Sequence, residues 1–259
     1  MTEERVLDYA DLDLPLRGYL YGTAPGAAPR PGLLLVHGGA GLDRHARDQA
    51  RRYAELGYAV LACDMFGPGV AGERDRIMAS VRGLRDDPDL LVRRGRAGLA
   101  ALAQLPETNG RFGAVGFCFG GLAALTLARN GVALDAAVSM HGALATVRRA
   151  EPGAVRAKLL VCHGARDPHV PVADVAAFAE EMIRAGADWR LTMYGNAVHG
   201  FTHAHAVPGE YPGVAYDGET DELSFAAAAE FLARAFTDAA AAADRADADS
   251  AADADNDAT

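Results

Sequence analysis

Two patterns of hydrophobic and polar positions alternate along the chain. Short apolar runs that end at Gly, Asp or His are typical of strands, and longer segments with apolar residues at helical spacing are typical of helices. The predicted strands are residues 17–22, 33–37, 58–64, 112–117, 135–140, 158–163 and 189–194. The predicted helices are residues 44–56, a short one near 76–84, 92–105, 121–129, 172–185 and 223–236. The rest of 67–91 is predicted to be mainly loop, and Asn109-Gly110 to be a turn.

Strands and helices that alternate at this spacing predict an α/β fold, with a mostly parallel central sheet and helices on both faces. The predicted strands are nearly continuous apolar runs, as strands covered on both faces require. Residues 17–22 are expected to form an antiparallel strand at the edge of the sheet. No internal repeat and no linker occurs before residue 238, so we expect a single domain over residues 1–237.

Residues 238–259 differ in composition from the rest of the chain. They contain seven Asp against one Arg, are otherwise mostly Ala, and include no large apolar residue that could pack on the domain. We therefore expect a disordered tail or a frayed extension of the last helix, with partner binding as the alternative. The whole chain has a formal net charge of −10, which argues against nucleic acid as a main partner.

The three cysteines, Cys63, Cys118 and Cys162, are odd in number and widely spaced, which does not predict a disulfide framework. The first residues are charged and lack the apolar run of a signal peptide. No segment approaches the roughly 20 apolar residues of a membrane span, so we expect no membrane association. A cytoplasmic, reducing location follows as an expectation, and it would suit a free thiol.

One cysteine lies in a motif typical of a nucleophile. The run from Gly116 to Gly120 reads G-x-C-x-G, with Cys118 at its centre, a predicted strand before it and a predicted helix after it. This is the nucleophile-elbow pattern of α/β-hydrolases with Cys in place of Ser. Small residues two positions away allow the sharp turn, and the start of the helix favours a thiolate. The alternative is a buried structural cysteine in a tight turn, which is the interpretation we prefer for Cys63 and Cys162.

An acid and a histidine follow two later strands. Asp167 comes four residues after the strand at 158–163, and His199 follows the strand at 189–194. The chain order Cys118, Asp167, His199 is the nucleophile–acid–histidine order of α/β-hydrolases. The alternatives are a turn-capping Asp and a packed loop histidine.

The oxyanion of an acyl-transfer reaction needs two backbone donors. We expect them to be the N–H groups of Phe119, next to the nucleophile, and of Gly39 in the early glycine-rich loop. A glycine turn without a catalytic role is the alternative for Gly39. The loop carries neither a P-loop nor a dinucleotide fingerprint, so we expect no phosphate or NAD binding there.

The remaining histidines near the motif allow a metal site to be considered. His199, His203 and His205 are close in sequence, but no carboxylate lies among them and His199 is needed by the nucleophile. We therefore expect no metal. His141 follows the strand at 135–140 and is expected at the rim of the site.

Together these residues resemble the dienelactone hydrolase family across roughly residues 5–237. The resemblance is carried by four segments, which are the stretch from Glu55 to Gly67, the run Gly116-Phe117-Cys118-Phe119-Gly120-Gly121, the segment from His163 to Pro171, and His199-Gly200-Phe201. It implies hydrolysis of dienelactones or other small esters without a metal or organic cofactor. It also implies a Cys–Asp–His triad at Cys118, Asp167 and His199.

Two positions depart from the well-studied members of that family. Those members carry a Glu beside the resting thiol where this chain has Gly38, and an Arg that holds the substrate carboxylate where it has His203. Both differences disfavour dienelactone itself as the substrate. The candidate substrate-pocket residues are Gly38, Phe66, His141, Phe201 and His203.

The sequence therefore predicts a hydrolase of small esters or enol lactones that works through a thioester on Cys118, as a monomer or homodimer. A general carboxylesterase or thioesterase of the same fold is the alternative among enzymes. A binding protein built on a hydrolase scaffold is the alternative outside them.

Overall fold

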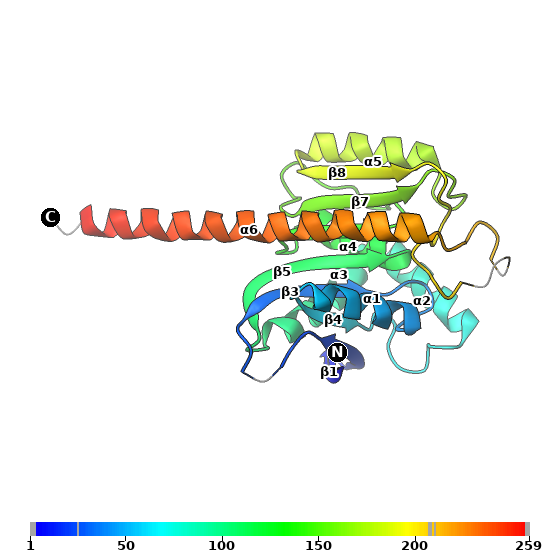
Figure 1. Ribbon diagram of the computed structural model, residues 1–259, viewed down its shortest axis with the longest axis horizontal. Helices are drawn as coiled ribbons and strands as arrows, with labels where there is room; N and C mark the ends of the chain where they lie inside the picture. The colour runs from blue at the N-terminus through cyan, green and yellow to red at the C-terminus, as the bar shows by residue number, and fades with distance from the viewer. Residues whose placement is uncertain (1–3, 25, 207–208, 210, 257–259) are drawn as a thin grey trace.

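The computed structural model describes residues 4–24, 26–206, 209 and 211–256. Its centre is an eight-stranded sheet in the order β1-β2-β4-β3-β5-β6-β7-β8 (Figure 1). The strands β3 to β8 run parallel, whereas β2 is antiparallel to both β1 and β4. The strand bounds are β1 Arg5–Asp11, β2 Leu14–Tyr21, β3 Arg30–Val36, β4 Ala59–Cys63, β5 Thr108–Phe117, β6 Ala136–Met140, β7 Lys158–Gly164 and β8 Trp189–Tyr194.

Helices cover both faces of this sheet, which confirms the predicted α/β-hydrolase architecture. Two helices, α1 (Arg44–Glu55) and α6 (Gly218–Asn256), pack on the face that is nearer the viewer in Figure 1. The opposite face is covered by α2 (Arg74–Asp86), α3 (Pro88–Ala103), α4 (Phe119–Arg129) and α5 (Val172–Ala185). Because β3 to β8 run parallel, their carboxyl ends meet at one edge of the sheet.

The core consists of two apolar layers, one on each side of the sheet. In β3, Leu33 and Leu35 face α1 and α6, whereas Leu34 and Val36 face the helices of the other side. All four are fully buried. Successive side chains of β3 point to opposite faces of the sheet, and both faces are covered. This part of the strand therefore has no polar position and is a continuous apolar run in the sequence.

Three local predictions are wrong. The antiparallel strand at the edge of the sheet is β1 rather than residues 17–22, which lie one strand further in. Most of β1 alternates half-buried and exposed residues, so it lacks an apolar run. Helix α3 begins at Pro88, because the side chain of Asp87 caps it by accepting from the N–H of Leu90. Asn109 and Gly110 do not form a turn but belong to β5, where its pairing with β3 is irregular.

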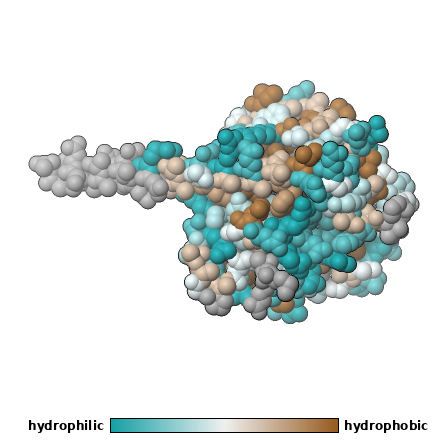
Figure 2. All heavy atoms as spheres, in the orientation of Figure 1, coloured by the Kyte–Doolittle hydropathy of each residue, from teal (hydrophilic) through white to brown (hydrophobic). Residues whose placement is uncertain are grey.

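The last helix continues far beyond the body of the molecule (Figure 1). Residues 238–256 of the expected disordered tail or frayed helix extension continue α6 as helix, and residues 257–259 lie outside the described part. The physical reason is the high alanine content, because alanine has the highest intrinsic helix propensity. Figure 2 shows the face that α1 and α6 cover, where hydrophilic and hydrophobic residues are interspersed over the body. No helix in the described part of the chain is long and apolar enough to cross a membrane.

Candidate active site

Cys118 lies in the sharp turn between β5 and α4. Its φ of 52° falls in the left-handed region that non-glycine residues rarely adopt. The turn is possible only because the residues two positions before and after Cys118 are glycines. A Cβ on Gly116 would collide with the carbonyl of Gly120, and a Cβ on Gly120 would collide with the carbonyl of Val36. The elbow therefore presents Cys118 at the carboxyl edge of the sheet, at the start of α4.

Asp167 follows β7 in a loop that holds its carboxylate rigidly. One carboxylate oxygen accepts from the backbone N–H groups of His169 at 2.8 Å and Val170 at 3.2 Å. The other oxygen, Oδ2, lies 2.7 Å from Nδ1 of His199. The carboxylate is thus fixed from both sides, as an orienting acid requires.

His199 lies in the loop after β8 and contacts both of the other predicted residues. Its Nε2 lies 3.1 Å from Sγ of Cys118, while its Nδ1 faces Asp167. The backbone of His199 is held in turn, because its N–H donates to the carbonyl of Gly213 and its carbonyl accepts from the N–H of Ala215. The structure therefore brings all three sequence-predicted residues into one hydrogen-bonded row.

The charges of this row favour an ion pair between the cysteine and the histidine. Burial opposes ionisation of Cys118, but the hydrogen bond and charge of His199 outweigh it, and the pKa of the thiol is lowered. Burial would lower the pKa of His199, but its hydrogen bonds to Asp167 and Cys118 raise that pKa well above its usual range. The pKa of Asp167 is lowered despite burial, by its hydrogen bond to His199. The two shifts together favour a thiolate beside an imidazolium.

The two expected oxyanion donors lie beside the sulfur. The backbone N–H groups of Phe119 and Gly39 both help to lower the pKa of Cys118, so both lie close enough to interact with Sγ. A Cβ added at Gly39 would meet no atom within 4 Å, which leaves space in front of its backbone. Two N–H groups next to the attacking atom are what a developing oxyanion needs.

The candidate pocket residues divide into two groups. Gly38 lies at the nucleophile, since a Cβ there would be 3.8 Å from Cβ of Cys118, and the ring of Phe66 lies 5.5 Å from that of Phe119. In contrast, His141 and Phe201 are buried and pack edge-to-face with centroids 4.9 Å apart. His141 and Phe201 therefore lie behind the site and offer little surface to a ligand.

His203, the fifth candidate, is engaged by protein groups. Its Nε2 lies 3.4 Å from the carboxylate of Asp43, and its ring stacks on His45 at 4.5 Å. The nearby His205 contacts Asp48 instead, at 3.2 Å. Among the described residues, no group of three or more His, Cys, Asp or Glu side chains is arranged to hold a metal ion.

Sequence reasoning missed several residues around the site. Buried His37, directly after β3, accepts from the N–H of Met65 and packs against Phe66 at 4.5 Å. Thr202 links His45 with His141 through its hydroxyl. The position of His37 directly after a predicted strand could have indicated that it lies near the site. Thr202 gives no such local pattern, because it contacts His45 and His141, which are 157 and 61 positions away in the sequence.

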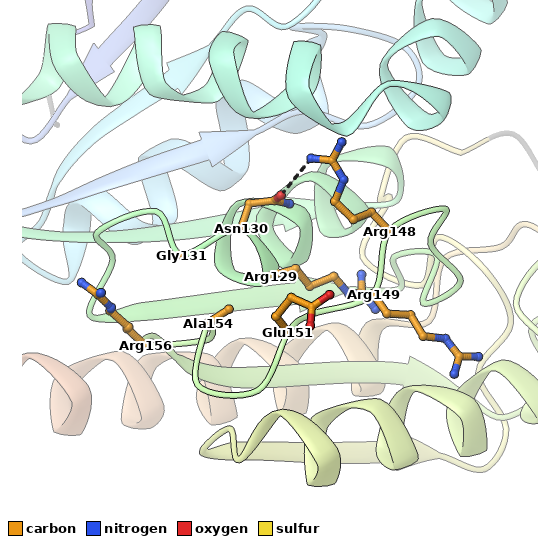
Figure 3. A pocket seen from close by; sticks show the side chains of 8 residues that line it. All are labelled: Arg129, Asn130, Gly131, Arg148, Arg149, Glu151, Ala154 and Arg156. Carbon is orange, nitrogen blue, oxygen red and sulfur yellow. Dashed lines mark hydrogen bonds between the residues drawn. The ribbon is translucent and has the colours of Figure 1, made fainter.

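A separate hollow of about 390 Å³ lies at the far end of α4 from Cys118. Four arginines line it, but Arg129 and Arg148 are already paired with carboxylates. Figure 3 shows the side chains of Arg149 and Arg156 extending in opposite directions. The four charges do not converge on a common point, and the hollow is not part of the active site.

The chain is similar to known proteins over most of its length. The model of the dienelactone hydrolase family matches residues 16–236. The carboxymethylenebutenolidase of Pseudomonas putida is 27% identical over 164 residues, which are 60% of this chain and 69% of that protein. An uncharacterized Caenorhabditis elegans protein is 35% identical over 148 residues, which are 54% of this chain and 90% of that protein.

Solved structures give the same result over more of the chain. The crystal structure of a dienelactone hydrolase-like promiscuous phosphotriesterase from metagenomic libraries superposes with a TM-score of 0.85 at 36% identity. The match covers 90% of this chain and 98% of that one.

Proposed function

The chain belongs to the dienelactone hydrolase family, and from that premise we propose that it hydrolyses small esters or enol lactones through a thioester on Cys118. Hydrolase activity follows from the family, whose curated members include carboxymethylenebutenolidases. The proposal adds the roles of individual residues. The observation that carries it is the row of contacts from Asp167 through His199 to Cys118, at 2.7 and 3.1 Å.

The proposed reaction begins with the thiolate. Sγ of Cys118 attacks the carbonyl carbon, and the carbonyl oxygen becomes an oxyanion that accepts from the N–H groups of Phe119 and Gly39. When the carbon–oxygen bond breaks, His199 gives its proton to the departing alkoxide or enolate. Neutral His199 then takes a proton from water, which attacks the thioester and releases the acid and the thiolate. Asp167 keeps Nδ1 of His199 protonated throughout.

The thiol favours activated substrates over amides. A thiolate is a better leaving group than an amine anion, so a tetrahedral adduct on Cys118 returns to an amide substrate more readily than it expels the amine. An enol or phenol ester has a stable leaving group that reverses this preference. General carboxylesterase or thioesterase activity at the same site remains the alternative within the fold.

The test is a panel of aryl esters, alkyl esters, thioesters and enol lactones, assayed with the wild type and Cys118→Ala. We expect turnover of activated esters or lactones in the wild type only. Acid quenching during turnover should trap a protein species heavier by the acyl group, which peptide mapping places on Cys118. Cys162→Ala is the matched control, because this thiol is buried and its pKa is raised by burial. Turnover by Cys118→Ala at the wild-type rate would overturn the proposal.

A second activity deserves a parallel assay because the structural neighbour at 36% identity is described as a promiscuous phosphotriesterase. A phosphotriester presents a phosphoryl oxygen that the same two N–H groups could bind. Sγ would displace an aryloxide from phosphorus, and water would then hydrolyse the phosphorus–sulfur bond. A dialkyl aryl phosphate tests this directly, with release of the phenol as the readout in wild type and Cys118→Ala.

A further inference from the structure

The side chain of Thr202 lies buried behind the active site, three residues after His199. Its hydroxyl oxygen is 2.9 Å from Nε2 of His141 and 3.1 Å from Nε2 of His45. The three side chains come from the loop after β8, the end of β6 and α1, and all are buried. We call Thr202, His141 and His45 the Thr202 clamp. A single hydroxyl thus joins the loop of the catalytic base to two other elements.

One member of the clamp also contacts the base itself. The ring of His141 packs edge-to-face on the ring of His199, with centroids 5.3 Å apart and planes at 67°. The residue before it, Met140, accepts a hydrogen bond from the N–H of Cys118 at 3.0 Å. The end of β6 therefore touches both the nucleophile and the base. His141 has a φ of 41°, a strained conformation that surrounding contacts must maintain.

The available partners determine which group donates and which accepts in each hydrogen bond of the clamp. No described residue offers a hydrogen-bond partner to Nδ1 of His141, so a proton there would be a buried donor without an acceptor. The proton of His141 is therefore assigned to Nε2, where it donates to the oxygen of Thr202. The hydroxyl proton of Thr202 is then free to donate to Nε2 of His45. Each hydrogen bond has one donor and one acceptor, and neither imidazole needs a charge.

We propose that Thr202 is a positioning residue, whose hydroxyl holds the ring of His141 and thereby holds His199 against Cys118. The inference rests on the proposed function, in which His199 pairs with the thiolate. The ring of His141 cannot rotate without losing its hydrogen bond to the Thr202 oxygen. It therefore presents a fixed surface against which the ring of His199 packs. Small displacements matter, because a misplacement of about 1 Å can cost on the order of 100-fold in rate.

The titratable groups that face His199 support a geometric effect rather than a change of charge. They are Cys118 and Asp167, which bond to it, and His141 and His169, whose rings lie 5.3 and 5.2 Å away. Buried His163 also interacts with it, because the charge of His199 adds to burial in lowering the pKa of His163. Burial keeps the pKa of His141 well below its usual range, so this ring is neutral at neutral pH. Removing the Thr202 hydroxyl therefore changes the support of His199 without removing a charge beside it.

The test is the pH profile of Cys118 alkylation by iodoacetamide, which needs no substrate. Thr202→Val removes the hydroxyl and keeps the shape. We expect its alkylation midpoint to rise toward the free thiol value, and its rate near pH 6 to fall on the order of tenfold, less than a misplacement of about 1 Å can cost. Thr202→Ser restores the hydroxyl and should restore the profile. His141→Phe keeps a ring but removes the donor, and it should shift the midpoint in the same direction.

The matched control is Thr126→Val, another buried threonine whose hydroxyl donates to the carbonyl of Leu122 within α4. It should lower stability without moving the midpoint. If folded Thr202→Val and His141→Phe both keep the wild-type midpoint, the inference is overturned. Should Thr202→Val not fold, His141→Phe and Thr202→Ser decide the question. Failure of the proposed function would appear separately, as turnover by Cys118→Ala.

Discussion

Nε2 of His199 lies 3.1 Å from Sγ of Cys118, so the base contacts the resting thiol directly. The pKa of the Cys118 thiol is lowered and that of the His199 imidazole is raised. Both shifts favour the thiolate–imidazolium ion pair. We predict that Cys118 reacts rapidly with iodoacetamide at neutral pH, with a midpoint below the free thiol value of about 8.5. His199→Ala should move the midpoint upward, because the thiolate then loses its cationic partner.

The other two cysteines provide an internal control for that measurement. Cys63 and Cys162 are buried, and burial raises the pKa of both thiols. They should react slowly in the folded protein, and mass mapping separates them from Cys118. A midpoint for Cys118 at or above the free value, unchanged by His199→Ala, would refute direct pairing.

Replacing the acid should test the orientation of the base. In Asp167→Asn the amide oxygen can still accept from the N–H groups of His169 and Val170, which leaves an amide N–H₂ facing Nδ1 of His199. His199 would then carry its proton on Nε2 and could not accept one there. We predict a loss in kcat on the order of 10³-fold or more, with little change in fold, measured by ester turnover and circular dichroism.

The close packing around the nucleophile elbow predicts that alanine destabilises the protein at Gly120 but not at a glycine with open space around it. A Cβ on Gly120 would meet the backbone carbonyls of Val36 and His37, which cannot move cheaply. Gly120→Ala should therefore give little soluble folded protein. Gly83→Ala is the matched control, because Gly83 lies in α2 and a Cβ there meets nothing within 4 Å. That change should be neutral or stabilise by about 0.5–1 kcal/mol, measured by denaturant unfolding.

The buried strands and the row of site residues could be predicted from the sequence because each leaves a local signal. Strands such as β4 and β6 are buried at every position, so their apolar runs stand out. Cys118 and Asp167 follow β5 and β7, which end in such buried runs. His199 follows β8, whose residues are half-buried or exposed, and its signal is its place in the chain order after Cys118 and Asp167. In contrast, β1 alternates at the sheet edge, and the start of α3 depends on a cap at Asp87.

The surroundings of the base could not be predicted in the same way. Thr202 contacts His45 and His141 only because the fold brings together α1, the end of β6 and the loop after β8. Neither the spacing nor the residue types distinguish these side chains from packed core residues. The sequence therefore placed His141 correctly near the site. It was wrong about exposure, because His141 is buried behind the rim.

The extension of α6 should be dispensable for folding. The last large apolar side chain of the helix is Phe236, which is buried against the sheet. Beyond it, Asp238 forms an exposed ion pair with Lys158 at 2.6 Å. Truncation after Thr237 should leave the melting temperature and ester turnover nearly unchanged, because exposed ion pairs contribute little. Truncation after Asp238 is the control that retains the pair. A large loss in both truncations would show that the extension packs elsewhere.

Gly38 offers a direct test of how the thiol is activated. A Cβ at this position would lie 3.8 Å from Cβ of Cys118 and 3.6 Å from the carbonyl of Phe117, which are ordinary contacts, so a longer side chain can begin here. In Gly38→Glu a carboxylate would be placed near the thiolate. Like charges oppose joint ionisation, so the pKa of Cys118 should rise and the alkylation midpoint should move upward.

Gly38→Gln separates charge from size in the same experiment. It adds the same number of heavy atoms without the charge, so it should crowd the oxyanion loop equally and leave the midpoint near the wild-type value. Loss of turnover in both variants would therefore reflect the shape of the loop, and only the difference between their midpoints reports the carboxylate. If Glu and Gln shift the midpoint equally, the electrostatic argument fails. If Glu lowers it, the carboxylate acts as a base toward Cys118, and His199 is no longer the sole group that activates the thiol.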